Sequence, residues 1–462
     1  AGHLVQRFTG LPKILGYAVF GTAVGLAGFA GGAWPLHGVG LYLLELGIAV
    51  VLFEAGARLS LRWFRHNPMV LVQSLVEALL TFFAAYLLLR ALELDVPVAR
   101  ALAVVSVAAS PAVLMRVVSD LRASGPVTDR AIALATLNTL YALTAGTAML
   151  RSIDRGDTTM LASLASSAAV LGVSLLVGAL LAALLVGAFK LLHPTSQDTA
   201  IVILALIGAC TAVTTPLGGS APLATLLAGI VLKQLQPRPW VWPRQLGTAA
   251  AMLNVLMFVL VSLMAAQADW HGALTWAALA LVAARMAAKL LSLLLTGPAS
   301  GLSLRQSLWV GVALVPMSSV ALLLTSQFVG ASHSVGARVA AIALPVILIT
   351  ELLGAVLVGL ALVRAREAVK PPTVNRDRWH DAASFWSIRG ADAGRRAGTA
   401  TGQHQRLRPG ALRRRHAAPD GAAQAARLGG AGNDGRHDRN LHRRLRHLAR
   451  RAGAADPDPR RA

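Results

Sequence analysis

Apolar and polar positions alternate along the chain in long blocks. Residues 13–363 contain twelve apolar stretches separated by shorter polar segments. Most of them approach the ~20 residues that a helix needs to cross the hydrocarbon core of a bilayer. The predicted spans are 13–33, 39–58, 68–91, 99–119, 130–151, 162–192, 197–215, 221–236, 246–267, 272–296, 304–328 and 339–363. Their lengths vary, so tilted and re-entrant segments are expected. The pattern predicts an all-α, polytopic protein embedded in a lipid bilayer.

Two of these stretches carry a proline near the middle, at corresponding places. Residues 100–111 read RALAVVSVAASP and residues 305–316 read RQSLWVGVALVP, with five identical positions when their prolines are aligned. Pro111 and Pro316 each remove a backbone donor and open the helix. Freed carbonyls are tolerated in lipid only where protein or a water-filled site satisfies them. Matching interruptions in two halves of a chain point to an internal repeat, with the binding site of a secondary transporter where the broken helices meet. The alternative is a chance match between two segments rich in Val and Ala.

Composition agrees with a membrane protein and excludes several other classes. Hydrophobic residues make up 55% of the 462 residues, and charged residues only 14%. The single cysteine, Cys210, lies inside a predicted span, so no disulfide can form within the chain. The sequence contains no P-loop, nucleophile elbow, dinucleotide fingerprint or Cys/His metal cluster. An enzyme is therefore not expected, and no cofactor or resident metal is predicted.

Basic residues favour one side of the predicted membrane. The stretches 58–65, 122–130 and 233–244 are rich in Lys and Arg, whereas turns 34–38 and 216–220 contain none. The positive-inside rule places the basic side, and with it the C-terminus, in the cytoplasm. This predicts a multi-pass protein of a bacterial inner membrane. The chain begins at alanine without a signal peptide, which suggests a truncated fragment from which a preceding helix is missing.

The last hundred residues differ from the rest. From Arg364 onward, 23 Lys and Arg stand against 9 Asp and Glu, so most of the net charge of +22 lies here. Such a segment cannot bury much apolar surface and is predicted to be disordered. It is either a polybasic tail that binds anionic lipid or, past about residue 380, an out-of-frame reading. No aromatic stacking residue follows Trp386, so nucleic acid is not an expected partner. The chain is thus divided into a transmembrane domain, 1–363, and a basic tail, 364–462.

Several segments, taken in order, carry a family resemblance. They are LVQRFTGLPKILGYAVFGTAVG, LLELGIAVVLFEAGARLSLRWFR, SVAASPAVLMRVVSDL, GPVTDRAIALATLNTLYAL, SAPLATLLAGIVLKQL, the helix with Arg285 and Lys289, and GVALVPMSSVALLL. Together they resemble the monovalent cation:proton antiporter superfamily, with a membrane domain of the sodium/hydrogen exchanger type, over roughly residues 3–363. The resemblance implies thirteen helices in inverted repeats, a homodimer, and a core domain that moves against a dimerisation domain.

The resemblance also implies a carboxylate at the bilayer midplane, for which a monovalent cation and protons compete. In the family it follows an Asn or Asp on the helix that corresponds to 130–151, where this sequence has Asn138 and Thr139. The carboxylate position is therefore occupied by a threonine, which cannot titrate. Ser110 and Pro111 occupy the family's motif at the first break. Ser110, Asn138 and Thr139 are predicted to offer neutral oxygens to Na⁺ or K⁺, together with carbonyls freed at the break.

Proton coupling then needs a carboxylate elsewhere. An ionised side chain at the bilayer centre costs ~2.5–3.5 kcal/mol on insertion scales, so it persists only when functional or paired. Glu54, deep in the span 39–58, is the expected substitute; its alternative role is an interhelical hydrogen bond or a dimer contact. Glu45, Glu77 and Glu351 also lie in predicted spans, as further site candidates or as structurally paired groups.

Two basic residues are predicted to balance the site. Arg285 and Lys289 are four residues apart and share one helix face. The resemblance implies that a basic residue here pairs with the site carboxylate or balances the broken helix ends. Arg285 needs an anionic partner, which is Glu54, a carbonyl at a broken helix end or a bound anion. Lys289 either joins the site or extends its ammonium group towards the interface.

The second break is predicted to contribute Pro316, Ser318 and Ser319, where relatives often carry charged residues. Three functions stay open. The first is exchange of a monovalent cation, Na⁺ or K⁺, for protons by alternating access. The second is transport of an organic anion on the same fold. The third is a non-transporting sensor or degenerate paralogue, which the threonine at 139 favours.

Overall fold

The computed structural model describes residue 5 and residues 13–27, 38–155, 160–192, 197–236, 244–266, 273–317 and 319–368. Within these ranges every regular element is a helix, and each of the twelve predicted spans coincides with a helix or with two consecutive helices. The predicted all-α, polytopic fold is confirmed. The basic tail beyond residue 368 lies outside the described residues, so the proposed boundary at 363/364 stays a prediction.

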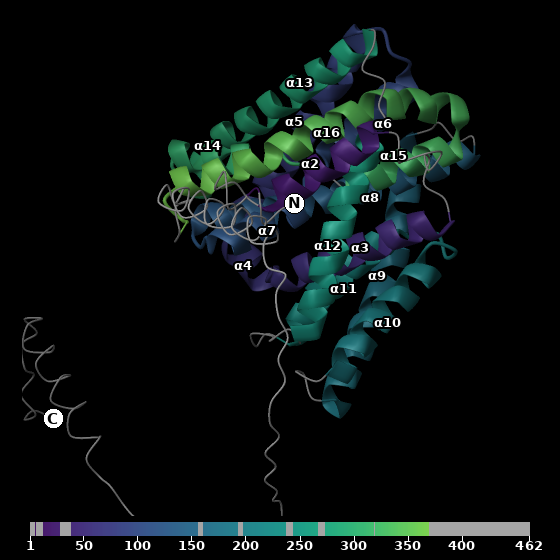
Figure 1. Ribbon diagram of the computed structural model, residues 1–462, viewed down its shortest axis with the longest axis vertical. Helices are drawn as coiled ribbons and strands as arrows, with labels where there is room; N and C mark the ends of the chain where they lie inside the picture. Colours follow the sequence, from purple (N-terminus) through teal and green to yellow (C-terminus); the bar gives the residue numbers. More distant parts are fainter. Residues whose placement is uncertain are drawn as a thin grey trace, which may run out of the picture. The chain divides into compact units, whose positions relative to one another are not determined.

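The helices pack in two groups, with the short α4 (Leu61–His66) and η1 (Pro298–Ser300) in connections. The core group surrounds the two breaks and comprises α5 (Met69–Ala91), α6 (Val96–Val107), α7 (Pro111–Leu121), α8 (Pro126–Arg155), α13 (Ala273–Thr296), α14 (Leu304–Ala313), α15 (Ser319–Ala331) and α16 (His333–Arg364). The scaffold group comprises α2 (Lys13–Leu26), α3 (Gly38–Arg58), α9 (Met160–Leu191), α10 (Gln197–Thr214), α11 (Ala221–Leu235) and α12 (Arg244–Ala265). Figure 1 shows α13 beside α5 and α16, and α9, α10 and α11 gathered together.

Seven segments of the described chain are long and apolar enough to cross a membrane, and five shorter apolar helices accompany them. The seven are Gly38–Arg58, Met69–Ala91, Val96–Leu121, Pro126–Ile153, Ala162–Leu191, Leu274–Thr296 and His333–Arg364. Their burial differs widely. The most apolar part of Val96–Leu121 is 89% buried, whereas that of Ala162–Leu191 is 33% buried. The first broken span therefore lies inside the bundle, and α9 presents an apolar outer face suited to lipid.

The first break follows from its local sequence. Helix α6 ends at Val107, and α7 begins at Pro111, whose missing N–H costs nothing at the first position of a helix. Ser110 is the N-cap: its backbone is extended, and its hydroxyl accepts a hydrogen bond from the amide of Val113 at 3.3 Å. The proline thus starts a new helix and leaves the last carbonyls of α6 without intrahelical partners.

The second break is longer and meets the first. Helix α14 begins with a capping box between Ser303 and Gln306 and ends at Ala313. Helix α15 begins at Ser319, so Pro316 lies within the break and not at the start of a helix. The backbone amide of Ser110 donates to the carbonyl of Pro316 at 3.0 Å. The predicted meeting of two broken helices is confirmed.

The scaffold group is held by close helix packing. A Cβ atom added to Gly56 on α3 would lie 2.2 Å from the carbonyl oxygen of Leu226 on α11. Conversely, a Cβ added to Gly229 on α11 would lie 2.3 Å from the carbonyl oxygen of Phe53 on α3. Small residues at both positions let the two backbones touch, as is common between helices in lipid.

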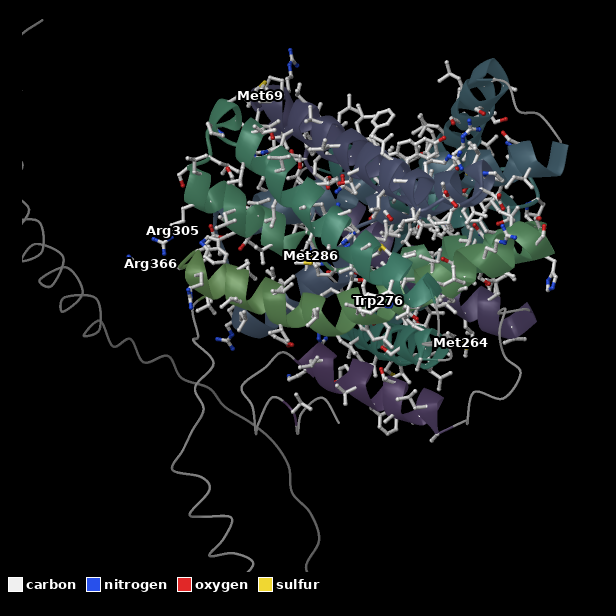
Figure 2. All side chains as sticks on the ribbon, turned by 90° about the horizontal axis from the view of Figure 1, so that it is seen from above. Met69, Met264, Trp276, Met286, Arg305 and Arg366 are labelled. Atoms are coloured by element: carbon white, nitrogen blue, oxygen red, sulfur yellow. The ribbon has the colours of Figure 1, made fainter. Side chains whose placement is uncertain are left out.

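Basic residues gather where several core helices start or end. Figure 2 shows Arg305, near the start of α14, and Arg366, after the end of α16, at the same edge of the molecule.

Glu367, which follows Arg366, caps α8. Its carboxylate accepts hydrogen bonds from the amides of Val127 at 2.8 Å and Thr128 at 2.7 Å. The first turn of α8 and the end of α16 are thereby joined.

Candidate functional site

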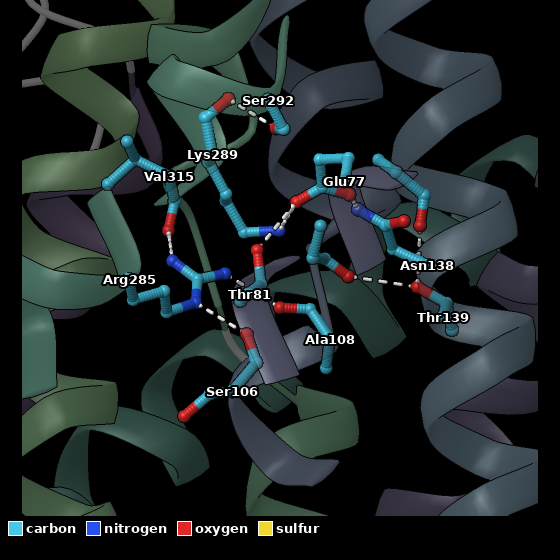
Figure 3. Close-up of polar contacts among 12 residues, drawn as sticks. Glu77, Thr81, Ser106, Ala108, Asn138, Thr139, Arg285, Lys289, Ser292 and Val315 are labelled. Carbon is cyan, nitrogen blue, oxygen red and sulfur yellow. Dashed lines mark hydrogen bonds and ion pairs between the residues drawn. The ribbon is translucent and has the colours of Figure 1, made fainter. Parts of the chain in front are cut away.

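Arg285, in the middle of α13, binds the open ends of both broken helices (Figure 3). Its side chain is fully buried. Its Nε donates to the carbonyl of Ser106 at 2.8 Å, and one Nη donates to the carbonyl of Ala108 at 2.7 Å. The other Nη donates to the carbonyl of Val315, in the second break, at 2.5 Å. Of the three partners considered for Arg285, the structure shows backbone carbonyls at the helix ends.

This arrangement balances charge as well as hydrogen bonds. The C-terminal end of a helix carries about half a negative charge, concentrated on its last unpaired carbonyls. Helices α6 and α14 both end at the crossing, so two such ends face one guanidinium group. A planar fork of N–H donors suits several fixed acceptors better than an ammonium group does. Arg285 therefore compensates the opened backbone.

One turn further along α13, Lys289 forms a buried ion pair with Glu77 of α5. Both side chains have no exposed surface, and Lys289 Nζ lies 2.5 Å from Glu77 Oε1. The hydroxyl of Thr81 donates to the same oxygen at 3.1 Å. The amide of Asn138, on α8, donates to the other oxygen, Glu77 Oε2. Three helices of the core group thus meet on one carboxylate.

Neutral oxygens complete the surroundings on α8. Thr139 follows Asn138, is fully buried, and directs its hydroxyl at two carbonyls, those of Ala109 in the first break at 2.9 Å and Ala135 at 2.8 Å. The Oδ1 atom of Asn138 is buried and has no hydrogen-bond partner within the described residues. A buried oxygen without a donor is costly to leave unpaired. The side-chain oxygen of Asn138 is therefore open to a cation or a water molecule.

The crossing as a whole carries two cations and one carboxylate. Glu77 and Lys289 neutralise each other, and the positive charge of Arg285 is opposed by the two helix ends. In a low-dielectric interior such a set is stable only when every charge has a partner. An added cation would upset this balance unless a positive charge left at the same time.

Three of the remaining predicted residues line a small cavity at the crossing. Ser110 and Pro111 of the first break and Ser319 at the start of α15 border that cavity, together with apolar residues of α3. Pro316 is buried and contributes its carbonyl to the contact between the breaks. Ser318 lies outside the described residues.

The structure does not bring Glu54 to this cluster. Glu54 lies near the end of α3, one quarter of its side chain is exposed, and it pairs with Arg58 one turn further on at 2.7 Å. The carboxylate that meets Lys289 is Glu77, which the sequence offers among several alternatives without selecting it. A usable signal does exist: Gln73, Ser74, Glu77 and Thr81 form a polar stripe at helical spacing in the apolar stretch 68–91, and all four are fully buried.

A larger cavity opens beside the start of α8. It has a volume of about 310 Å³ and lies between α3, α4 and α8, lined by residues that include Arg58, Trp63, Asp129 and Ile132. The guanidinium group of Arg130 lies over the ring of Trp63, 5.6 Å from its centroid. This cavity and the small cavity at the crossing both border α3, at different points along the helix.

The fold and the crossing define a multi-pass membrane protein of the secondary-transporter class. The family model described as "Sodium/hydrogen exchanger, transmembrane" matches residues 1–364. The chain belongs to this family, as the resemblance of its segments predicts. No curated protein matches the sequence.

Solved structures agree at the level of the fold. Two structures of the sodium proton antiporter MjNhaP1 from Methanocaldococcus jannaschii, one of them at pH 8, are each similar to this chain with a TM-score of 0.59 and 16% sequence identity. They cover 78% and 80% of this chain and 95% of the antiporter chain. At this identity the similarity concerns the fold alone. The residues of the site are argued from this chain's own geometry.

Proposed function

We propose that the protein exchanges a monovalent cation, Na⁺ or K⁺, for protons by alternating access, and that the cation competes with protonated Lys289 for the carboxylate of Glu77. The buried Glu77–Lys289 pair beside the crossed breaks is the observation that carries the proposal. An ion pair at this depth is expensive to maintain unless it serves a purpose. Family membership supports exchange, and Glu77 supplies the carboxylate that position 139 lacks.

The charges of the crossing suggest how exchange is coupled. While Lys289 is protonated and bound to Glu77, a second cation at that carboxylate would leave an uncompensated buried charge. Loss of the Lys289 proton frees Glu77 to bind the metal ion, with Asn138 Oδ1 and the Thr139 hydroxyl as additional neutral oxygens. Return of the proton to Lys289 expels the ion. One cation then replaces one proton, and Arg285 keeps the opened backbone in place in both states.

Access from the basic side is proposed to pass along α3. The 310 Å³ cavity opens beside Asp129, whose carboxylate can attract cations, and the small cavity reaches Ser110, Pro111 and Ser319. The positive-inside rule assigns this basic side, and the C-terminus, to the cytoplasm of a bacterium. Movement of the core group against the scaffold group would close this route and open one on the opposite side. A homodimer through the scaffold group belongs to the same proposal.

The two other functions receive less support. An organic anion would need free donors from Arg285, yet this side chain already binds three backbone carbonyls. A non-transporting role rests on the absence of a carboxylate at 139, and Glu77 offers one on the neighbouring helix, hydrogen-bonded to Asn138. Neither alternative accounts for a carboxylate held between a lysine and an asparagine.

The test is cation-driven pH change in proteoliposomes, with Na⁺, K⁺ and Li⁺ supplied separately. Wild type should exchange at least one of these ions for protons, and Glu77→Gln should exchange none. Glu54→Gln is the matched control, because Glu54 is partly exposed and paired with Arg58; it should retain exchange. If Glu54→Gln is silent and Glu77→Gln is active, the assignment of the carboxylate is wrong. A wild type that is silent with every ion, but active as Thr139→Asp, would identify a degenerate exchanger.

A further inference from the structure

A second buried carboxyl takes no part in the hydrogen bonds and the ion pair of the crossing. Glu351, on α16, has no exposed surface, and neither of its oxygens has a hydrogen-bond partner within the described residues. The hydroxyl of Ser262, on α12, lies close to it without forming a hydrogen bond of normal geometry, and is equally buried. Glu351 is thus the opposite of Glu77, whose carboxylate is bound by a lysine, a hydroxyl and an amide.

Glu351 lies on the seam between the two helix groups. Helix α16 belongs to the core group and packs against α12 and α2 of the scaffold group. Its neighbours on α16 fix its depth: the hydroxyl of Thr350 reaches the carbonyl of Met317 at 3.4 Å, and Gly354 packs directly on Pro316. The carboxyl is therefore level with the second break, far from both ends of its helix.

No charged side chain of the described residues compensates Glu351. Helix α15, which packs along α16, carries no ionisable residue. The described titratable side chains on the other helices packed against α16 are Lys13, Tyr17, Arg100, Arg116, Asp120, Arg285, Lys289 and Arg305. None of them forms an ion pair or a hydrogen bond with Glu351 within the described residues. Arg285 and Lys289, the two buried cations, are engaged at the crossing.

We propose that Glu351 is a second proton-binding site, separate from the cation site at Glu77, and that it holds its proton as a neutral carboxylic acid in this conformation. An ionised carboxylate enclosed without a partner is strongly disfavoured, whereas a neutral acid is tolerated.

Release of this proton requires the contact between the core group and the scaffold group to open around Glu351. Water or a new partner must reach Glu351 before its carboxylate can form, and the seam is where the core group meets the scaffold group. Relative movement of the groups is part of the proposed exchange, so this step rests on the proposed function. The presence of a proton on Glu351 in this conformation does not depend on that function.

Infrared difference spectroscopy of the purified full chain tests the site directly, without transport. At neutral pH and without Na⁺, wild type should show the carbonyl band of a protonated carboxyl, which shifts in D₂O. Glu351→Gln should lack that band, and Glu54→Gln should keep it, because Glu54 is paired with an arginine. Since glutamine has the shape of the neutral acid, the variant is expected to fold.

Further outcomes of the same experiment would overturn the proposal that Glu351 holds a proton, or would support it. A band that persists in Glu351→Gln would overturn the proposal, and so would a band that Na⁺ removes at constant pH. Ser262→Ala should shift the frequency of the band without removing it; an unchanged frequency would assign the protonated carboxyl to another residue. Because the spectra need no exchange activity, failure here is distinguishable from failure of the Glu77 assignment in proteoliposomes.

Discussion

The helix crossing in the core group and the α3–α11 contact in the scaffold group are stabilised by opposite means. At the crossing, the backbone is opened, Arg285 binds the freed carbonyls, and Lys289 forms a buried ion pair with Glu77. Along α3 and α11, the helices are unbroken and approach until Gly56 and Gly229 touch the opposite backbone. The crossing is held by charged groups that an ion or a proton can replace. The α3–α11 contact is held by the close packing of two complementary helix surfaces. We expect the crossing to respond to ligands and the glycine contact to act as a fixed support.

Breaking the ion pair should have the largest effect. Glu77→Gln leaves Lys289 buried without a charged partner, and removal of one member of a buried ion pair costs ~3–5 kcal/mol. The variant should lose exchange, and its thermal unfolding in detergent should occur at lower temperature. Adding Lys289→Met should restore much of the stability, because both charges are then gone, without restoring exchange.

The double variant separates stability from function in this comparison. Full additivity of the two substitutions in thermal unfolding would mean that Glu77 and Lys289 do not interact. Recovered exchange in the double variant would mean that neither charge carries ions.

Arg285→Met should have the second-largest effect on stability. It leaves the carbonyls of Ser106, Ala108 and Val315 without their donor, and at about 1 kcal/mol for each buried acceptor the loss is of order 3 kcal/mol. Thermal unfolding measures it. Arg305→Met is the matched control on an exposed arginine and should change the free energy of unfolding by less than about 0.5 kcal/mol. Equal effects of the two substitutions would contradict the role of Arg285 at the crossing.

Gly229→Ala tests the scaffold side. The added Cβ would lie 2.3 Å from a backbone oxygen of α3, so the helices must separate, at ~1–3 kcal/mol for an overpacked contact. Gly187→Ala, in α9, is the control, because a Cβ there meets no atom within 4 Å. The first variant should unfold at lower temperature and retain the ion selectivity of wild type. A selectivity change in Gly229→Ala would show that the scaffold is not a passive support.

The smallest effect is expected at the α8 cap. Glu367→Ala removes the carboxylate that accepts from Val127 and Thr128, and loss of a cap costs about 1 kcal/mol. Hydrogen exchange of these two amides should accelerate, while exchange deeper in α8 stays slow. Arg364→Ala, at an exposed residue near the same helix end, should leave both amides protected. Acceleration in both variants would indicate fraying of α16 instead of loss of the cap.

Much of the fold can be read from the sequence, because the bilayer imposes simple rules. Long apolar blocks predict the spans, and the prolines at 111 and 316 predict the breaks. The two prolines occupy different places in their breaks, which the sequence alone does not show. Pro111 starts α7 with Ser110 as its cap, whereas Pro316 lies inside an irregular segment and α15 starts at Ser319. The family resemblance, confirmed by the match over residues 1–364, supplies the order of the elements.

The site is harder to predict, because pairing depends on which helices face each other. Arg285 and Lys289 share a helix face in the sequence, but only packing shows that one meets carbonyls and the other meets α5. Glu54 and Glu77 both lie in apolar spans. Glu54 has an arginine at i+4 that can neutralise it locally, whereas Glu77 has none on its own helix within a turn and must find a cation elsewhere. That local difference favours Glu77 even without a structure.

Proton release on cation binding tests the central claim most directly. Na⁺ or K⁺ is added to purified protein in weakly buffered solution, and the change in pH is recorded for wild type and Glu77→Gln at equal concentration. If a cation and a proton compete at the Glu77–Lys289 pair, wild type releases protons as the cation is added, and Glu77→Gln releases none. Proton release of the same size from Glu77→Gln would contradict the account, because the competition would then take place at another residue.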